Sequence, residues 1–119
     1  MRDHRKLRAF QLADELVLAV YAATRAFPKE ELFGLTSQLR RAAVSIASNI
    51  VEGSARNSQA DYLRFLDMSY ASAHEVEYQI SIAARLSYMN EVTALDLATK
   101  SDETARVLAG LIRSIKTTS

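Results

Sequence analysis

The sequence of 119 residues has no cysteine, no tryptophan, a single proline and only three glycines. Without cysteine the chain forms no disulfide framework and offers no thiolate for catalysis or metal binding. This composition fits a reducing compartment, so we expect a cytoplasmic protein. No apolar run approaches the roughly 20 residues that a membrane-spanning helix requires, and we expect no membrane partner.

The start of the chain combines basic residues with the short apolar run LVLAVYAA, as secretory signals do. Asp14 and Glu15 immediately precede that run, where a signal sequence would avoid charge. The run also continues a helical pattern that extends from Phe10 to Phe27. We therefore expect the first helix of the mature domain rather than a cleaved signal.

Histidine is also scarce, since only His4 and His74 occur and neither follows a glutamate by three residues. Helical bundles that hold two metal ions use that spacing on two of their helices. The sequence also contains no Gly-x-Ser-x-Gly motif and no glycine loop of the kind that binds phosphate. We expect no metal site, no cofactor and no enzymatic activity.

The few helix-breaking residues make the expected boundaries easy to place. Breaks fall at Pro28, Gly34, Gly53 and Asn90. Between them, apolar residues recur every three or four positions and predict helices over residues 7–26, 36–52, 58–86 and 91–117. The stretch FPKEELFG predicts a short helical connector, Ser58 with Asp61 forms a capping-box pattern, and Gly53 lies where a helix end often needs positive φ. Because the connections are short, we predict one domain, residues 1–119, with an all-α, antiparallel up-down-up-down four-helix bundle.

The expected helix over residues 7–26 is apolar over an unusually wide arc. Its predicted core face is Phe10, Ala13, Val17, Val20, Tyr21, Thr24 and Phe27. Much of the remaining surface is apolar as well, through Leu12, Leu16, Leu18, Ala19, Ala22 and Ala23. A helix of this kind is buried on more than one side, so we expect a second subunit to cover it.

The other three expected helices have narrower core faces. In residues 36–52 and just before them, the face is Leu35, Leu39, Ala42, Ala43, Ile46, Ala47, Ile50 and Val51. In residues 58–86 it is a heptad-like seam of Tyr62, Leu66, Ser69, Ala73, Val76, Ile80 and Ala83. In residues 91–117 we expect burial of Val92, Leu95, Ala98, Ala105, Leu108, Ile112 and Ile115.

A second strip on the helix at 36–52 is polar and consists of Arg41, Ser45, Ser48, Asn49 and Glu52. Such a strip is usually a solvated face, but its short side chains suit a close helix approach, and Glu75 and Glu77 follow on the next helix. A hairpin centred near residue 56 brings Glu75 within one turn of the residue level with Arg40. We expect an ion pair, Arg41 with Glu75 or Arg40 with Glu77, partly buried between helices or subunits.

The run FPKEELFGLTSQLRRAAVSIASNIVEGSAR, at residues 27–56, forms a connected motif with the segment EVEYQ further on. Its structural positions include Arg41, Ser45, Asn49, Glu52, Gly53, Glu75 and Glu77. The motif resembles that of the 23S rRNA intervening-sequence proteins, also called the S23 family. The chain departs from the family pattern at Ala47, where proline is common, and at Ala71, where glycine is common.

This resemblance implies a homopentameric ring of four-helix protomers. A related branch is similar to the accessory variability protein of diversity-generating retroelements, which binds nucleic acid and a reverse transcriptase through a positively charged pentameric surface. Two hypotheses follow: a non-enzymatic oligomeric scaffold that acts through protein–protein assembly, and an RNA- or DNA-binding accessory protein. The net charge of +1 does not by itself indicate a polyanion partner. The basic candidates for nucleic-acid binding are Arg40, Arg56, Arg5, Lys6 and Arg8.

Overall fold

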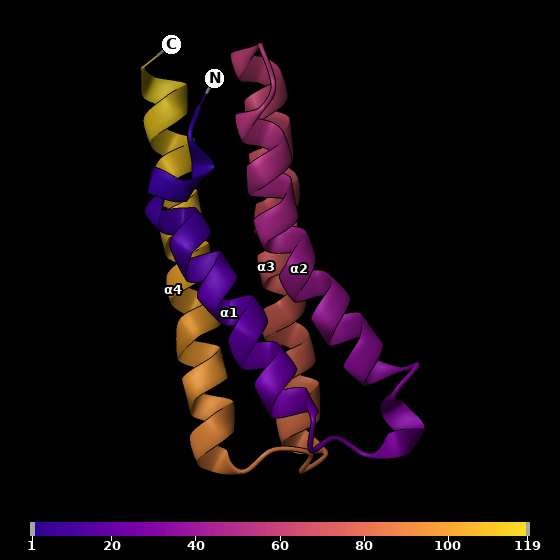
Figure 1. Ribbon diagram of the computed structural model, residues 1–119. Coiled ribbons are helices and arrows are strands. Elements are labelled where there is room, and N and C mark those ends of the chain that lie inside the picture. Colours follow the sequence, from indigo (N-terminus) through magenta and orange to yellow (C-terminus); the bar gives the residue numbers. More distant parts are fainter. Residues whose placement is uncertain (1, 119) are drawn as a thin grey trace.

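The computed structural model describes residues 2–118, and all regular secondary structure in that range is helical. The long helices are α1 Arg8–Thr24, α2 Leu35–Ser54, α3 Gln59–Arg85 and α4 Glu91–Thr117. Two short 3-10 helices are η1 His4–Lys6, before α1, and η2 Lys29–Glu31, in the connector between α1 and α2. The prediction of an all-α chain with four long helices is confirmed. Figure 1 shows both termini and the α2–α3 connection at one end, and the other two connections at the opposite end.

The helix boundaries follow local hydrogen bonds. Ser58 Oγ accepts from Asp61 N–H at 3.1 Å, as the capping pattern predicted, and Asn90 Oδ1 accepts from Thr93 N–H at 2.8 Å. The helix α1 ends two residues earlier than predicted, at Thr24, whose hydroxyl donates back to Val20 O at 2.8 Å. Such local bonds compete with the regular helix ladder, so they favour a helix end at this position.

The core is a continuous apolar cluster to which all four long helices contribute. Its fully buried large side chains include Leu16, Val20, Leu39, Ile46, Ile50, Leu66, Val76, Leu97 and Leu108. All seven residues of the seam predicted on α3 are buried. In α2, five of the eight predicted residues are buried, Leu35 and Ala47 are half-buried, and Val51 lies on the surface.

The predicted core faces of α1 and α4 contain larger errors. In α1, Tyr21 is 41% exposed, and Leu16 is buried instead. In α4, Val92 and Leu95 are 80% and 69% exposed. The first buried residue there is Leu97, which lies five positions after Val92 and therefore about 140° round the helix. The helical spacing of the apolar residues was predicted correctly. The side of the helix that faces the core was predicted wrongly in the first turns of α4, where Val92 and Leu95 face solvent.

The helices α2 and α3 approach each other closely at Gly53. A Cβ at this position would lie only 2.8 Å from Phe65 Cβ and 3.2 Å from Tyr62 Cδ1. Gly53 lies one residue before the end of α2, close to the expected helix end, but it has no positive φ. The close approach of α3 therefore explains the glycine. Further along, Ser69 Oγ donates to Ile46 O at 2.7 Å. This contact places the centre of the hairpin near residue 58 rather than near residue 56.

Substitution of Gly53 tests this packing. We expect Gly53→Ala to lower the free energy of unfolding by about 1–3 kcal/mol, because the added methyl group forces α2 and α3 apart. The matched control is Gly110→Ala in α4, where a Cβ would meet only Arg113 Nη2 at 3.9 Å. There, removal of a helix-interior glycine should raise stability by about 0.5–1 kcal/mol. Urea unfolding followed by circular dichroism measures both, and equal effects of the two substitutions would contradict the packing account.

Candidate functional site

The connector between α1 and α2 is fixed by the carboxylate of Glu31. Its Oε1 accepts from Leu35 N–H at 3.0 Å, at the start of α2, and its Oε2 accepts from the hydroxyl of Tyr88 at 2.8 Å. The ring of Tyr88 also packs against Phe27, with centroids 5.4 Å apart. A Cβ at Gly34 would lie 2.6 Å from Glu31 Oε1, so glycine leaves room for the carboxylate. The first part of the family motif therefore anchors this connector to the α3–α4 connection.

These hydrogen bonds change the ionisation of both groups. The bond from Leu35 N–H, and then that from Tyr88, hold the pKa of the Glu31 carboxyl below its ordinary value. The bond to Glu31 and the nearby negative charge raise the pKa of the Tyr88 hydroxyl. The pair is thus most stable with Glu31 ionised and Tyr88 protonated.

The middle of the polar strip on α2 packs against α3. Ser45 Oγ and Ser72 Oγ share a hydrogen bond of 2.9 Å across the two helices. Asn49 Nδ2 donates to Ser45 O at 2.9 Å and to Ser45 Oγ at 3.0 Å. The Ser45–Ser72 bond joins the two helices at close range, as the small size of the side chains predicted, and the bonds of Asn49 hold Ser45 from within α2. Glu52, at the end of the same strip, is exposed.

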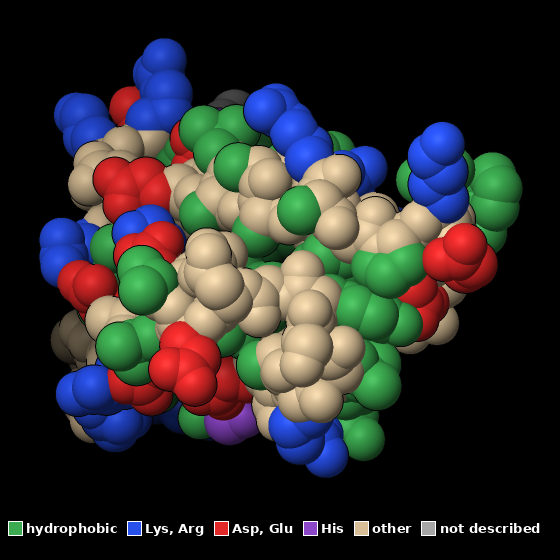
Figure 2. Space-filling view, turned by 90° about the horizontal axis from the view of Figure 1, so that it is seen from below, with side chains coloured by type: hydrophobic (Ala, Val, Ile, Leu, Met, Phe, Trp, Pro, Cys, Tyr) green, Lys and Arg blue, Asp and Glu red, His purple; other side chains and the backbone are tan. Residues whose placement is uncertain are grey.

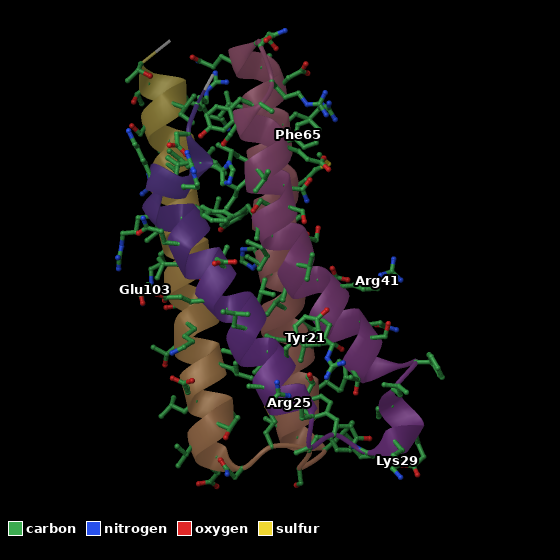
Figure 3. The ribbon with its side chains drawn as sticks, in the orientation of Figure 1. Tyr21, Arg25, Lys29, Arg41, Phe65 and Glu103 are labelled. Carbon is green, nitrogen blue, oxygen red and sulfur yellow. The ribbon has the colours of Figure 1, made fainter. Side chains whose placement is uncertain are left out.

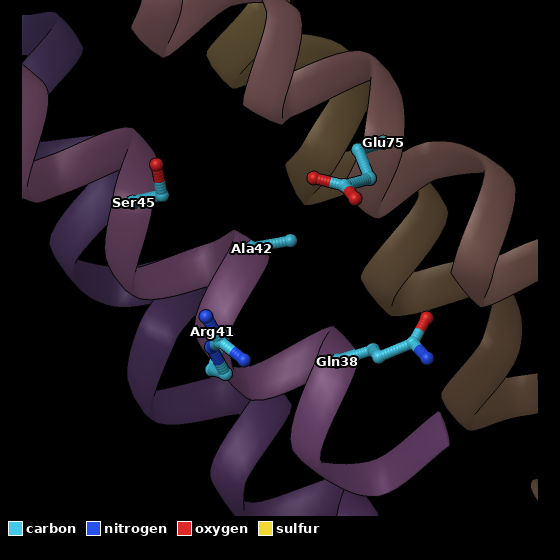
Figure 4. Close-up of a pocket in the computed structure, with 5 residues that line it drawn as sticks. All are labelled: Gln38, Arg41, Ala42, Ser45 and Glu75. Carbon is cyan, nitrogen blue, oxygen red and sulfur yellow. The ribbon is translucent and has the colours of Figure 1, made fainter. Parts of the chain in front are cut away.

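A polar groove of about 440 Å³ opens between α2 and α3, lined by Gln38, Arg41, Ala42, Ser45 and Glu75 (Figure 4). It forms where the N-terminal half of α2 leans away from α3 (Figure 1). Arg41 and Glu75 line the same groove from different helices but form no ion pair with each other within residues 2–118.

Neither predicted ion pair forms inside the described part of one chain. Arg40 Nε donates to Thr24 Oγ1 at 2.8 Å, and its guanidinium lies 4.7 Å from the centroid of the Tyr21 ring. Glu77 Oε2 instead lies 3.6 Å from His74 Nδ1. The splay of α2 and the shifted hairpin centre separate the expected partners. Pairing between subunits stays a prediction.

The outer face of α1 and α2 is apolar and open to solvent. Its exposed large side chains are Leu18, Tyr21, Val44 and Val51, and Leu18 is 68% exposed. Between the two helices runs a groove of about 310 Å³, which we call the α1–α2 groove, lined by Asp14, Val17, Val44, Ala47, Ser48, Val51 and Glu52. Its only charged residues are thus acidic, and contiguous exposed apolar surface of this kind marks interaction sites.

A cluster of arginines occupies the end of the bundle that carries the N-terminus and the α2–α3 connection. Arg2 Nη1 donates to Arg56 O at 2.9 Å, and its guanidinium lies 4.1 Å from the Tyr62 ring centroid. The guanidinium groups of Arg56 and Arg64 lie 4.5 Å and 4.7 Å from the ring centroid of Phe65, which Figure 3 labels near this end. Cation–π contacts of this kind orient arginine side chains. We call these three residues the arginine cluster.

The other predicted basic candidates are differently placed. Arg5 pairs with Asp3 at 3.0 Å, Arg8 pairs with Glu103 on α4, and Lys6 is exposed on η1. Arg40 lies near the start of α2, at the opposite end of that helix from the arginine cluster, and donates a hydrogen bond to Thr24. The sequence analysis did not predict that aromatic rings lie under the arginine cluster. The run ADYLRF carries a signal for this, because Arg64 lies between Tyr62 and Phe65.

The described residues contain no group of three or more side chains that could hold a metal ion. In the same range, no helix combines the length and hydropathy needed to cross a membrane. The described residues also present three surface features: the polar groove, the apolar outer face and the arginine cluster.

The model of the 23S rRNA-intervening sequence protein family matches residues 5–110. The chain belongs to this family. Its fold is similar to the crystal structure of a protein of unknown function from the S23 ribosomal protein family of Bacteroides thetaiotaomicron VPI-5482. The TM-score is 0.80 at 23% sequence identity, over 88% of this chain and 95% of that chain. A search among curated proteins found no match. The family expected from the motif at residues 27–56 is thereby confirmed.

The Glu31–Tyr88 pair predicts how stability depends on pH. Because folding lowers the pKa of Glu31, stability should decline as the pH falls below about 4.5. Because folding raises the pKa of Tyr88, stability should also decline as the pH rises above about 10. We expect Glu31→Gln to flatten the acidic decline and Tyr88→Phe to flatten the alkaline decline, measured as urea unfolding against pH.

The matched control for these profiles is Tyr78→Phe, because Tyr78 is exposed on α3 and makes no side-chain hydrogen bond within residues 2–118. Its profile should equal that of the unsubstituted chain. An unchanged acidic decline in Glu31→Gln would show that the charge of this cap does not stabilise the fold.

Proposed function

We propose that this protein is a non-enzymatic, cytoplasmic scaffold whose working form is a homo-oligomer. In this proposal each chain is an up-down-up-down four-helix protomer, and five protomers close into a ring. The observation that carries it is the apolar outer face of α1 and α2, where Leu18, Val44 and Val51 are exposed in the single chain. Burial of such a face is the dominant favourable term in most protein association.

The pentameric number comes from the family resemblance, and the exposed face supports an assembly of that kind. Most soluble oligomers are closed homo-oligomers, and a ring of five requires two different surfaces on every protomer. The acidic residues Asp14 and Glu52 at the α1–α2 groove would favour a partner surface with basic groups.

A second candidate function, binding of RNA or DNA as an accessory protein, is favoured by the arginine cluster. Arginine binds phosphate through a planar fork of donors, and the rings of Tyr62 and Phe65 hold three such groups at one end of the bundle. Repetition around a ring would strengthen the attraction for a polyanion well beyond that of one chain with a net charge of +1. A reverse transcriptase would be the corresponding protein partner.

Light-scattering mass together with the A260/A280 ratio tests both candidates. We expect a particle of five times the 13.2 kDa of one chain, with an absorbance ratio typical of protein alone. Val44→Glu should lower this mass, because it places charge in the apolar face. The control is Leu95→Glu, which changes an equally apolar but more exposed residue of α4 and should leave the mass unchanged.

A mass of one chain at all concentrations would contradict the scaffold proposal. Added duplex DNA or structured RNA distinguishes the second candidate, since a salt-sensitive complex at low salt would support it. The complex should then weaken in Arg56→Ala and not in Arg85→Ala, whose residue is exposed at the opposite end of α3.

A further inference from the structure

The largest exposure of any large apolar side chain among the described residues is that of Phe33, at 93%. Phe33 and the half-exposed Leu32 lie between η2 and α2, in the connector that projects from the side of the bundle (Figure 1). Seen from below, hydrophobic and charged side chains gather at this projecting edge (Figure 2). The two hydrogen bonds of Glu31 fix the connector. Phe33 is therefore presented to solvent on an anchored element.

The α1–α2 groove is suited to accept an exposed apolar side chain such as Phe33. Its apolar walls consist of Val17, Val44, Ala47 and Val51. Its volume of about 310 Å³ offers room for an apolar side chain. Asp14 and Glu52 supply its only charges, and neither forms an ion pair within residues 2–118. An apolar insert flanked by cations would satisfy both properties.

Phe33 is flanked by such cations. Lys29 precedes it by four residues and Arg41 follows it by eight, and neither has an ion-pair partner in the part of the chain that the structure describes. Figure 3 shows both side chains directed away from the bundle on the side where the connector projects. The connector also carries Glu30, which is exposed, and Glu31, which is bound to Tyr88. Lys29 and Arg41 are therefore the groups on this side that complement Asp14 and Glu52 of the α1–α2 groove.

Phe33 cannot reach the groove of its own chain. Ser48 in the groove lies 15 residues further along, mostly within α2, and a helix rises 1.5 Å per residue, so the separation is roughly 20 Å. The insert and the groove lie at different places on one molecule. In the proposed ring, a contact between them is heterologous and repeats from copy to copy until the rotation closes, whereas a reciprocal contact between two copies would close a dimer.

We propose that Phe33 of one copy inserts into the α1–α2 groove of the next copy, with Lys29 and Arg41 beside Asp14 and Glu52. This inference rests on the proposed homo-oligomeric scaffold and names the surfaces that close its ring. It also gives a common role to Arg41 and Glu52, two motif residues that have no ion-pair partner within residues 2–118.

Cysteine cross-linking tests the contact cleanly, because the natural chain contains no cysteine. The double variant Phe33→Cys with Ser48→Cys should form, on mild oxidation, a ladder of disulfide-linked chains up to the full ring. Each single variant should stay without cross-links, since equivalent residues of neighbouring copies are far apart in a heterologous contact. The matched control, Phe33→Cys with Ser114→Cys, places the second thiol on exposed α4 and should give no ladder.

The same contact predicts a loss of assembly in Phe33→Ser without loss of folding, because Phe33 is almost fully exposed in the protomer. Removal of a central aromatic anchor should raise the concentration at half assembly about 30-fold. Val92→Ser, at 80% exposure on α4, is the control and should have no effect. Lys29→Glu should weaken assembly, and Asp14→Lys in the same chain should restore it.

The possible outcomes distinguish failure of the Phe33 contact from failure of the proposed homo-oligomeric scaffold. A particle of ring mass without the ladder would overturn the Phe33 contact and leave the scaffold standing. A mass of one chain in the unsubstituted protein would overturn both. A ladder together with ring mass supports both.

Discussion

The separation of α2 and α3 is set by small groups, and the other helices are arranged around that pair. Gly53 leaves no space for a Cβ against Phe65, and Ser69 reaches the backbone of Ile46. Both contacts require the two helices to be close and in one register, and together they lock the hairpin. One side of α2 packs against α3. The other side lies beside α1, and the two helices together form the outer apolar face. Where α2 leans away from α3, the polar groove opens.

The family motif then divides by role. Glu31, Gly34, Ser45, Asn49 and Gly53 all serve the internal structure through hydrogen bonds or close packing. The charged motif residues Arg41, Glu52 and Glu75 have no ion-pair partner within residues 2–118. Exposed charges without a partner contribute little to the stability of one chain. Their role in our proposals lies between copies, which would explain why a single motif contains both kinds of residue.

Sequence reasoning captured the fold where one face is clearly apolar. The seam on α3 was fully correct, because polar residues separate its apolar positions at helical spacing. In α1 the apolar arc is so wide that periodicity could not choose between Leu16 and Tyr21. The site was less predictable, since the bond of Glu31 to Tyr88 joins residues 57 positions apart and leaves no periodic signal. The arginines above Phe65 depend in the same way on side-chain placement.

Side-chain labelling by hydroxyl radicals in the native particle tests the central claim most directly. If the outer face of α1 and α2 is the assembly surface, Leu18, Val44 and Val51 should be labelled far more slowly in the particle than their exposure in one chain allows. Val92 and Leu95, exposed on α4, provide the internal reference and should be labelled rapidly. Equal labelling of both sets, at rates that follow single-chain exposure, would contradict an assembly through this face.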